Sequence, residues 1–407
     1  MRDHTSKIFV YLSCLAISLF FFYVLFLMGM LNTISQQLIQ TIGLPQHLYS
    51  LLSASYFLAD AIFLIPVGII LDRYNTRKIL LFALAVCVIS HFYFAFSNSV
   101  FSIWIYRITS GIGNAFAFLG TVRYASYLFP NDKGFAISSM ITIGIFGGIV
   151  AQSPLALLIH HIGWENAMST SAFTGLLIFI FALFFLKDNE STRIKENLNL
   201  YLTSFKGALS RLQNWLCAFY AGFLNLMVSL FSTAWSNLYL IRHHNYTNVQ
   251  ASSITSMIFI GVLFGAPAFG YISDIFRNRK NVMIFGALGS FLTILPIVLN
   301  FHVSFLGLYI LFMLLGVFSS AQVISYPTVA ESNPSYLISA ATGVIAITIN
   351  IVAAFSNFLF DWISQLSQTE NITINYQYAI IILPVASLVS LFAAFILKEP
   401  NKKKIGS

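Results

Sequence analysis

The chain alternates between long apolar runs and short polar turns. Twelve runs are long enough to cross a hydrocarbon layer about 30 Å thick, which takes about 20 helical residues. Because a helix satisfies its own backbone polar groups, each run is predicted to be α-helical. The predicted spans are residues 8–32, 47–71, 79–97, 101–128, 134–160, 165–186, 214–240, 251–272, 281–299, 303–329, 337–361 and 377–397. This pattern predicts an all-α membrane protein with twelve transmembrane helices.

One connector is longer and more polar than the others. It begins Lys187-Asp-Asn-Glu and extends to about residue 213, so it separates six spans from six. We therefore expect an N-terminal six-helix bundle at 1–187, a connector at 188–213, and a C-terminal bundle with a short basic tail at 214–407. The first apolar run is too long for a signal-peptide core and is predicted to remain as the first helix.

Composition and charge fit this assignment. The chain of 407 residues is 58% hydrophobic and 8% charged, whereas soluble domains carry about 25% charged residues. The net charge of +8 does not indicate a nucleic-acid partner, because the basic residues lie in short loops between spans. All Lys and Arg residues except Arg107, Arg123 and Arg242 fall on the side of the N-terminus, while Asp361 is expected in an outer loop. The protein is thus expected in the inner (plasma) membrane with both termini cytoplasmic.

Residues suited to catalysis or metal binding are not grouped in the sequence. Cys14, Cys87 and Cys217 are far apart in apolar runs, and the pairs His160-His161 and His243-His244 lack the spacing of a metal motif. The spans contain no evident pair of nucleophile and base. We expect neither a metal, nor a cofactor, nor an enzyme.

The loop after the second span recurs after the eighth. Gly68-x-x-x-Asp72 with Arg77-Lys78 returns 202 positions later as Gly270-x-x-x-Asp274 with Arg279-Lys280. A repeat of this kind predicts two copies of one membrane unit, which would make two pseudo-symmetric bundles.

The spans, the doubled loop and the pattern Arg107-x-x-x-Gly111-x-Gly113-x-Ala115 together resemble the major facilitator superfamily of secondary transporters. Shorter phrases, Gln152-Ser-Pro154 and Gly163-Trp164 among them, resemble bacterial nutrient and amino-acid permeases. The first resemblance implies alternating access, in which two bundles open a shared path to each side in turn. The second makes an amino acid or related nutrient one candidate solute.

The resemblance also implies a role for the repeated loops. Asp72 and Asp274 would face the starts of helices in the opposite half, where free N–H groups stabilise a carboxylate. Neighbouring charges would complete a latch that breaks during transport, or else form ordinary solvated loops. The basic residues Arg73, Arg77, Arg277 and Arg279 would pair with Asp132 and Glu331. Gly68 and Gly270 are expected to allow close helix packing.

Charged residues inside spans are candidate parts of a solute or proton path. Asp60 is the one acid well inside a span, roughly 18 Å from Asp72 along a helix. Ionisation there is costly, so Asp60 is a candidate proton carrier or a neutral packing group. Arg107 and Asn114 share one face of span four and could contact solute or form a structural pair. Arg123 either attracts an anionic solute group or extends to water.

Two further spans carry neutral polar stripes. Span seven places Asn225, Ser229, Ser232 and Ser236 at helical spacing, with Trp235 beside them. Span ten does the same with Ser319, Gln322 and Tyr326. Such stripes either line a solute path or form interhelical hydrogen bonds.

The favoured function is a monomeric secondary transporter that takes up a small organic solute with protons. An efflux pump for a drug or siderophore-like metabolite is the alternative. A channel would not need a repeated gating loop, and a receptor would usually carry a soluble domain.

Overall fold

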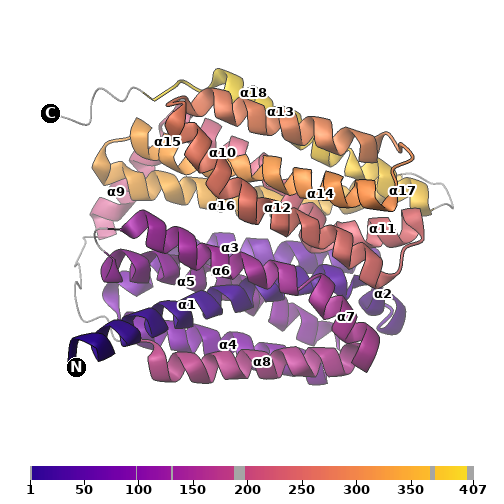
Figure 1. The fold of residues 1–407 in the computed structure, drawn as a ribbon, viewed down its shortest axis with the longest axis horizontal. Coiled ribbons are helices and arrows are strands. Elements are labelled where there is room, and N and C mark those ends of the chain that lie inside the picture. The colour runs from indigo at the N-terminus through magenta and orange to yellow at the C-terminus, as the bar shows by residue number, and fades with distance from the viewer. Residues whose placement is uncertain (1, 98, 130–131, 188–197, 367–371, 401–407) are drawn as a thin grey trace. The chain divides into compact units, whose positions relative to one another are not determined.

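The computed structural model describes residues 2–97, 99–129, 132–187, 198–366 and 372–400, and all regular structure within these ranges is helical (Figure 1). The chain divides into two compact units. Unit 1 is Met1–Lys195 with Asn248–Ser252, and unit 2 is Glu196–Thr247 with Ser253–Ser407. Long helices run side by side within each unit, as expected for membrane-spanning bundles (Figure 1).

Unit 1 consists of eight helices that account for the first six predicted spans. They are α1 (Arg2–Thr33), α2 (Ser35–Thr41), α3 (Gln46–Arg73), α4 (Thr76–Phe96), α5 (Val100–Leu128), α6 (Lys133–Val150), α7 (Ser153–Ile162) and α8 (Trp164–Phe185). Predicted span five is interrupted, because the helix stops after Val150 and restarts at Ser153. Pro154 suits this restart, since a first-turn residue needs no N–H donor.

Unit 2 contains the last six spans and part of the connector. Its elements are α9 (Leu198–Leu209), α10 (Leu212–Leu224), η1 (Met227–Trp235), α11 (Ser236–His244), α12 (Asn248–Ile275), α13 (Arg279–Val298), α14 (Phe305–Ser319), η2 (Ser320–Ile324), α15 (Ser325–Ser332), η3 (Ser335–Leu337), α16 (Ile338–Leu366), α17 (Ile372–Ile380) and α18 (Ile382–Ile396). The connector was expected to be a polar linker, but its second half forms α9, which packs on α16 and buries Ala208.

Eleven helical segments in the described part are long and apolar enough to cross a membrane. The remaining predicted span is α5, which has 29 residues but is less apolar than the others. Arg107, Asn114 and Arg123 all lie on α5, so the least apolar span is also the one that carries the two arginines predicted inside spans.

Two predicted spans lose α-helical geometry midway. Span seven contains the π-helix Met227–Trp235, and span ten contains the 3₁₀-helix Ser320–Ile324. Departures of this kind often occur at functional sites. They also change the angle between successive side chains, so the α-helical spacing assumed for both polar stripes does not hold across them.

Glycine sets the closest helix contacts in both units. A Cβ atom on Gly111 of α5 would collide with the carbonyl oxygen of Tyr56 on α3, and one on Gly316 of α14 would collide with that of Ile258 on α12. Because Tyr56 and Ile258 are 202 positions apart, the same contact recurs at matching places. The internal packing of each unit thus carries the repeat seen in the sequence.

Candidate functional site

The seam between α3 and α5 gathers most of the predicted charged residues of unit 1. At its centre the side-chain amide of Asn114 donates a hydrogen bond to Asp60, with 2.7 Å between Nδ2 and Oδ2. Asp60 is only 3% exposed. The other amide atom, Asn114 Oδ1, is buried without a hydrogen-bond partner among the described residues. The buried carboxyl group of Asp60 is therefore bonded to an amide whose oxygen can still accept a hydrogen bond.

Arg107 is fully buried two helical turns before Asn114 on α5. Its guanidinium donates to four backbone carbonyls, at 3.1 Å to Leu52, 3.2 Å to Ser53, 3.5 Å to Leu27 and 3.4 Å to Met28. The ring of Tyr56 lies 4.8 Å from the guanidinium carbon, within the range of a cation–π contact. The face of α5 that carries Arg107 was expected to line a cavity. At Arg107 this face instead packs against α1 and α3.

At the loop end of the seam, Arg123 forms an ion pair with Asp72. The Arg123 side chain is 23% exposed and that of Asp72 is 48% exposed. This pairing differs from both expectations for Arg123, because its partner is the gating-loop carboxylate rather than water or a solute.

The corresponding loop of unit 2 is held by a bridge. Arg279 binds Glu331 at the end of α15 with 2.8 Å between Nη2 and Oε1, as expected for the latch. Arg279 also binds Asp274 at 2.7 Å, so it links the end of α12 to the end of α15. Of the pairs named for the latch, Arg279–Glu331 is the one that forms among the described residues, and its role in a latch stays a prediction.

The other latch residues have different surroundings. Arg77 donates to the backbone carbonyl of Leu183 at 2.7 Å, and Arg73 and Arg277 are exposed without an ion pair in the described ranges. Asp132 is exposed, makes no described ion pair, and does not cap α6 with its side chain.

The two loop glycines are not needed for packing inside their own units. A Cβ on Gly68 would only touch Leu119 at 3.9 Å, and one on Gly270 would meet nothing within 4 Å. The tight approach expected of them occurs at Gly111 and Gly316 instead.

Sequence reasoning missed a carboxylate that secures the second loop. Glu399, just after α18, accepts hydrogen bonds from the backbone N–H groups of Arg279 and Lys280, each at 2.8 Å. Two of the free N–H groups at the start of α13 are thereby satisfied by an acid, while the N-cap Asn278 accepts from the N–H of Asn281. Lys280 in turn donates to the carbonyl of Phe395 at 2.7 Å. No local motif signals this contact, because its partners are about 120 positions apart.

Span seven places its polar residues inside unit 2. Ser229 and Ser232 donate to the carbonyls one turn earlier, those of Asn225 and Val228. Trp235 is fully buried and donates to Asn357 Oδ1 at 3.0 Å, and its ring stacks on Phe360 at 4.4 Å. The stripe is therefore bound partly to its own backbone, not to neighbouring helices throughout.

Span ten and α16 add further polar groups. Gln322 is part-buried, and its Oε1 has no hydrogen-bond partner in the described structure, while Tyr326 packs against the apolar core. On α16 a buried stripe was missed, although its spacing of i, i+7 and i+11 was readable: Asn350, Asn357 and Asp361. Asp361 was expected in an outer loop, yet it is a buried helical residue, so Asp60 is not alone as a buried acid in a helix.

No group of three or more His, Cys, Asp or Glu residues in the described ranges is placed to hold a metal ion.

Comparison with known proteins gives the family. Residues 15–247 and 215–407 each match the model of the Major Facilitator Superfamily, so the matches span nearly the whole chain. Among curated relatives, the drug efflux pump JefA of Mycobacterium tuberculosis is 26% identical over 132 residues, 32% of this chain and 26% of that protein. A probable hexose phosphate transport protein of Chlamydia muridarum is 22% identical over 272 residues, 60% of this chain and 59% of the relative. The matched segments span less than two thirds of either relative.

Solved structures agree on the fold. A D-xylose–proton symporter superposes with a TM-score of 0.74 at 17% identity, covering 97% of this chain and 98% of the symporter. The prediction of twelve membrane helices in two pseudo-symmetric bundles is confirmed, with α5 as the least apolar of them. The chain is a membrane-embedded, multi-pass transporter rather than an enzyme, and it belongs to the major facilitator superfamily.

Proposed function

We propose that this transporter takes up a small organic solute together with protons, by alternating access of its two bundles. The observation that carries the proposal is the Asp60–Asn114 hydrogen bond within the α3–α5 seam. A buried acid inside a membrane helix is costly and is commonly found on ion pathways. The proposed location is the inner membrane with cytoplasmic termini, and the proposed functional form is a monomer.

The geometry offers a simple two-state proton site. An ionised Asp60 accepts the amide N–H of Asn114, as in the described structure. A protonated Asp60 has a donor, and Asn114 Oδ1 has no competing partner among the described residues. Rotation of the amide would let the carboxylic O–H donate to that oxygen. Asn114 could therefore bind both protonation states, which is what a reversible proton carrier requires.

The solute contacts are proposed mainly in unit 2. Gln322 offers a buried amide oxygen and the partly buried Tyr326 an aromatic ring, together with Asn225 and Ser229. Trp235 is fully buried, so its proposed role is to support these groups. These groups suit a neutral or zwitterionic solute. In unit 1, Arg107 and Arg123 already contact carbonyls and Asp72, which favours a solute without strong net charge. An amino acid or related nutrient remains the first class to test.

We test this function with purified protein in proteoliposomes. A thermal-shift screen against amino acids, sugars, carboxylates and siderophores first identifies a stabilising solute. An inward proton gradient should then drive accumulation of that solute, and an uncoupler should abolish it. Asp60→Asn should lose accumulation, whereas Glu165→Gln, an exposed residue on α8, should behave like wild type. Accumulation by Asp60→Asn that still collapses with an uncoupler would contradict the assignment of Asp60.

The drug efflux pump among the relatives supports one alternative, export of a drug or siderophore-like metabolite. Direction separates the two proposals. An exporter would confer resistance in intact cells and load solute into inside-out vesicles in exchange for protons. The uptake proposal predicts neither result.

The two loop networks are proposed to act as a latch. In each unit the aspartate at the end of the second membrane span, Asp72 on α3 or Asp274 on α12, is tied to the fourth span, directly through Arg123 in unit 1 and through Arg279 in unit 2. This arrangement supports a role in holding one state of the transport cycle.

A further inference from the structure

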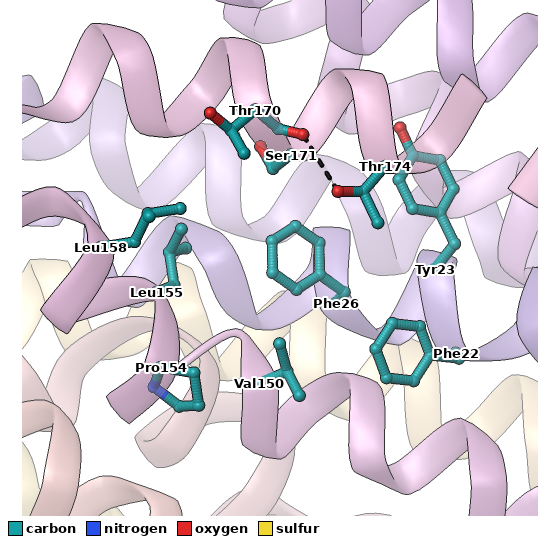
Figure 2. A pocket seen from close by; sticks show the side chains of 10 residues that line it. All are labelled: Phe22, Tyr23, Phe26, Val150, Pro154, Leu155, Leu158, Thr170, Ser171 and Thr174. Atoms are coloured by element: carbon teal, nitrogen blue, oxygen red, sulfur yellow. Dashed lines mark hydrogen bonds between the residues drawn. The ribbon is translucent and has the colours of Figure 1, made fainter. Parts of the chain in front are cut away.

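Unit 1 contains a pocket of about 220 Å³ that the transport proposal does not use (Figure 2). It lies beside the break between α6 and α7, where Gln152 leaves helical geometry with φ −96° and ψ −99°. Its lining residues come from α1, α6, α7 and α8: Phe22, Tyr23, Phe26, Val150, Pro154, Leu155, Leu158, Thr170, Ser171 and Thr174.

The pocket offers hydrocarbon and almost no free polar group. Each hydroxyl in its wall is already committed: Thr170 donates to the carbonyl of Asn166 at 2.8 Å, Thr174 to that of Thr170 at 3.0 Å, and Ser171 to that of Met168 at 2.8 Å. The Tyr23 hydroxyl is hydrogen-bonded to His91 Nδ1 at 2.8 Å, and no charged side chain lines the pocket. The hydroxyl protons in the wall are therefore not free for a ligand, and binding here rests mainly on apolar contact.

The rim of the pocket belongs to an apolar outer surface. Thr170 and Thr174 are exposed on α8, in line with Phe173 and Leu177, whose side chains are 53% and 67% exposed. Leu157 continues this surface on α7 at 44% exposed. Large apolar side chains exposed along a membrane-spanning helix face lipid chains. The pocket thus opens where hydrocarbon is the surrounding medium.

The distance of the pocket from the end of α8 indicates which part of a lipid could occupy it. Thr170 and Thr174 lie six and ten residues after Trp164, where α8 begins. At 1.5 Å per residue, that is about 9 to 15 Å inside the helix end. Headgroup charges do not reach this depth, and the pocket provides no partner for them.

We propose that the pocket binds part of the acyl chain of a membrane phospholipid. A cavity of about 150 Å³ holds a benzene molecule, so this pocket has room for a segment of a chain. The floor of the site is α1, through Phe22, Tyr23 and Phe26. Tyr23 also packs against Gly175 of α8 so closely that a Cβ there would collide with its phenol group. A bound chain would therefore support the contact between α1 and α8.

Photo-crosslinking tests the proposal on the full chain. The protein is reconstituted with phosphatidylcholine that carries a diazirine in mid-chain, illuminated, digested and mapped by mass spectrometry. We expect adducts on Phe22, Phe26 or Leu158, in addition to adducts on outward-facing residues. Leu158→Trp should fill the pocket and remove at least four fifths of the buried adducts. Leu177→Trp, on the exposed face of α8, should leave them unchanged.

A second, smaller substitution shows whether a loss of adducts in Leu158→Trp comes from filling the pocket or from misfolding. Val150→Phe, at the end of α6, adds less volume to the pocket and should reduce the same adducts about two-fold or more, with a monodisperse size-exclusion profile. Adducts confined to outward-facing residues, or buried adducts that both filling variants leave intact, would overturn the proposal. Loss of the buried adducts on adding a transported solute would also overturn it, because the solute would then be the ligand that occupies the pocket.

Discussion

At the scale of single residues, Arg107 shows how a membrane bundle accommodates a charge that forms no ion pair with any described residue. Four backbone carbonyls, two from α1 and two from α3, accept from its guanidinium. Arginine suits this position because its five N–H donors are fixed in a planar fork. The contacts tie α5 to α1 and α3, so burial of Arg107 is explained without an anionic ligand.

This geometry predicts that Arg107→Lys destabilises the protein. A lysine retains the charge but cannot reach all four carbonyls, and each buried polar group left unpaired costs about 1–3 kcal/mol. We expect Tm in detergent to fall by several degrees. The matched change Arg123→Lys affects a partly exposed ion pair and should shift Tm by little. Equal Tm values for wild type and Arg107→Lys would show that the carbonyl contacts do not matter.

Asp72 should matter for transport more than for stability. Partly exposed ion pairs contribute about 0–1 kcal/mol, so Asp72→Asn should leave Tm and expression almost unchanged. The latch proposal predicts that uptake is nevertheless lost. Exchanging the charges, with Asp72→Arg and Arg123→Asp together, tests whether the pair itself is what transport requires. Wild-type uptake by Asp72→Asn would end the latch proposal for unit 1.

At the scale of helices, the start of α13 depends on a residue that follows α18. Glu399 accepts two backbone N–H groups there, and loss of a cap typically costs about 0.5–2 kcal/mol. Glu399→Gln should therefore increase hydrogen exchange in the first turn of α13 while α4 is unaffected. Lys398→Gln is the control, since Lys398 contacts Gln213 through backbone atoms. Unchanged protection of α13 in Glu399→Gln would contradict this account.

The recurring glycine contacts predict matched effects in the two units. Gly111→Ala and Gly316→Ala each place a methyl group against a carbonyl oxygen, so both should lower Tm. Gly270→Ala should not, because its Cβ would meet nothing within 4 Å. The measurement is thermal unfolding of the three variants side by side. A larger loss for Gly270→Ala than for the other two would refute the packing argument.

Sequence reasoning predicted helix ends and the repeat well because both depend on local signals. Apolar runs located the helices, and the shared offset of 202 predicted the pair α3 and α12, which begin at Gln46 and Asn248. The same offset of 202 does not hold for the residues that follow Asp72 and Asp274, however. The second loop is one residue longer, as the N-caps Asn75 and Asn278 show.

This extra residue changes which basic side chains correspond. Arg77 was matched to Arg279, but by position in the helix it corresponds to Lys280. Arg77 binds a carbonyl near the end of α8, and Lys280 binds one near the end of α18. The π-helix, the 3₁₀-helix and the Glu399 cap were not predicted, because they depend on tertiary packing that periodicity does not encode.

At the scale of the whole molecule, the fold of the major facilitator superfamily is confirmed and the transport cycle is proposed. Two six-helix bundles of the major facilitator superfamily each tie an acidic loop to their fourth span. A secondary transporter needs a group that binds a proton in one state and releases it in another. Asp60, hydrogen-bonded to Asn114, is the proposed group, and its removal should uncouple protons from solute without preventing exchange.

The most direct test measures proton movement and solute exchange in the same proteoliposomes. A pH-sensitive dye inside the vesicles reports protons, and radiolabelled solute reports counterflow. Wild type should show solute-driven acidification together with counterflow, whereas Asp60→Asn should keep counterflow and lose acidification. Acidification by Asp60→Asn at the wild-type rate would contradict the central claim.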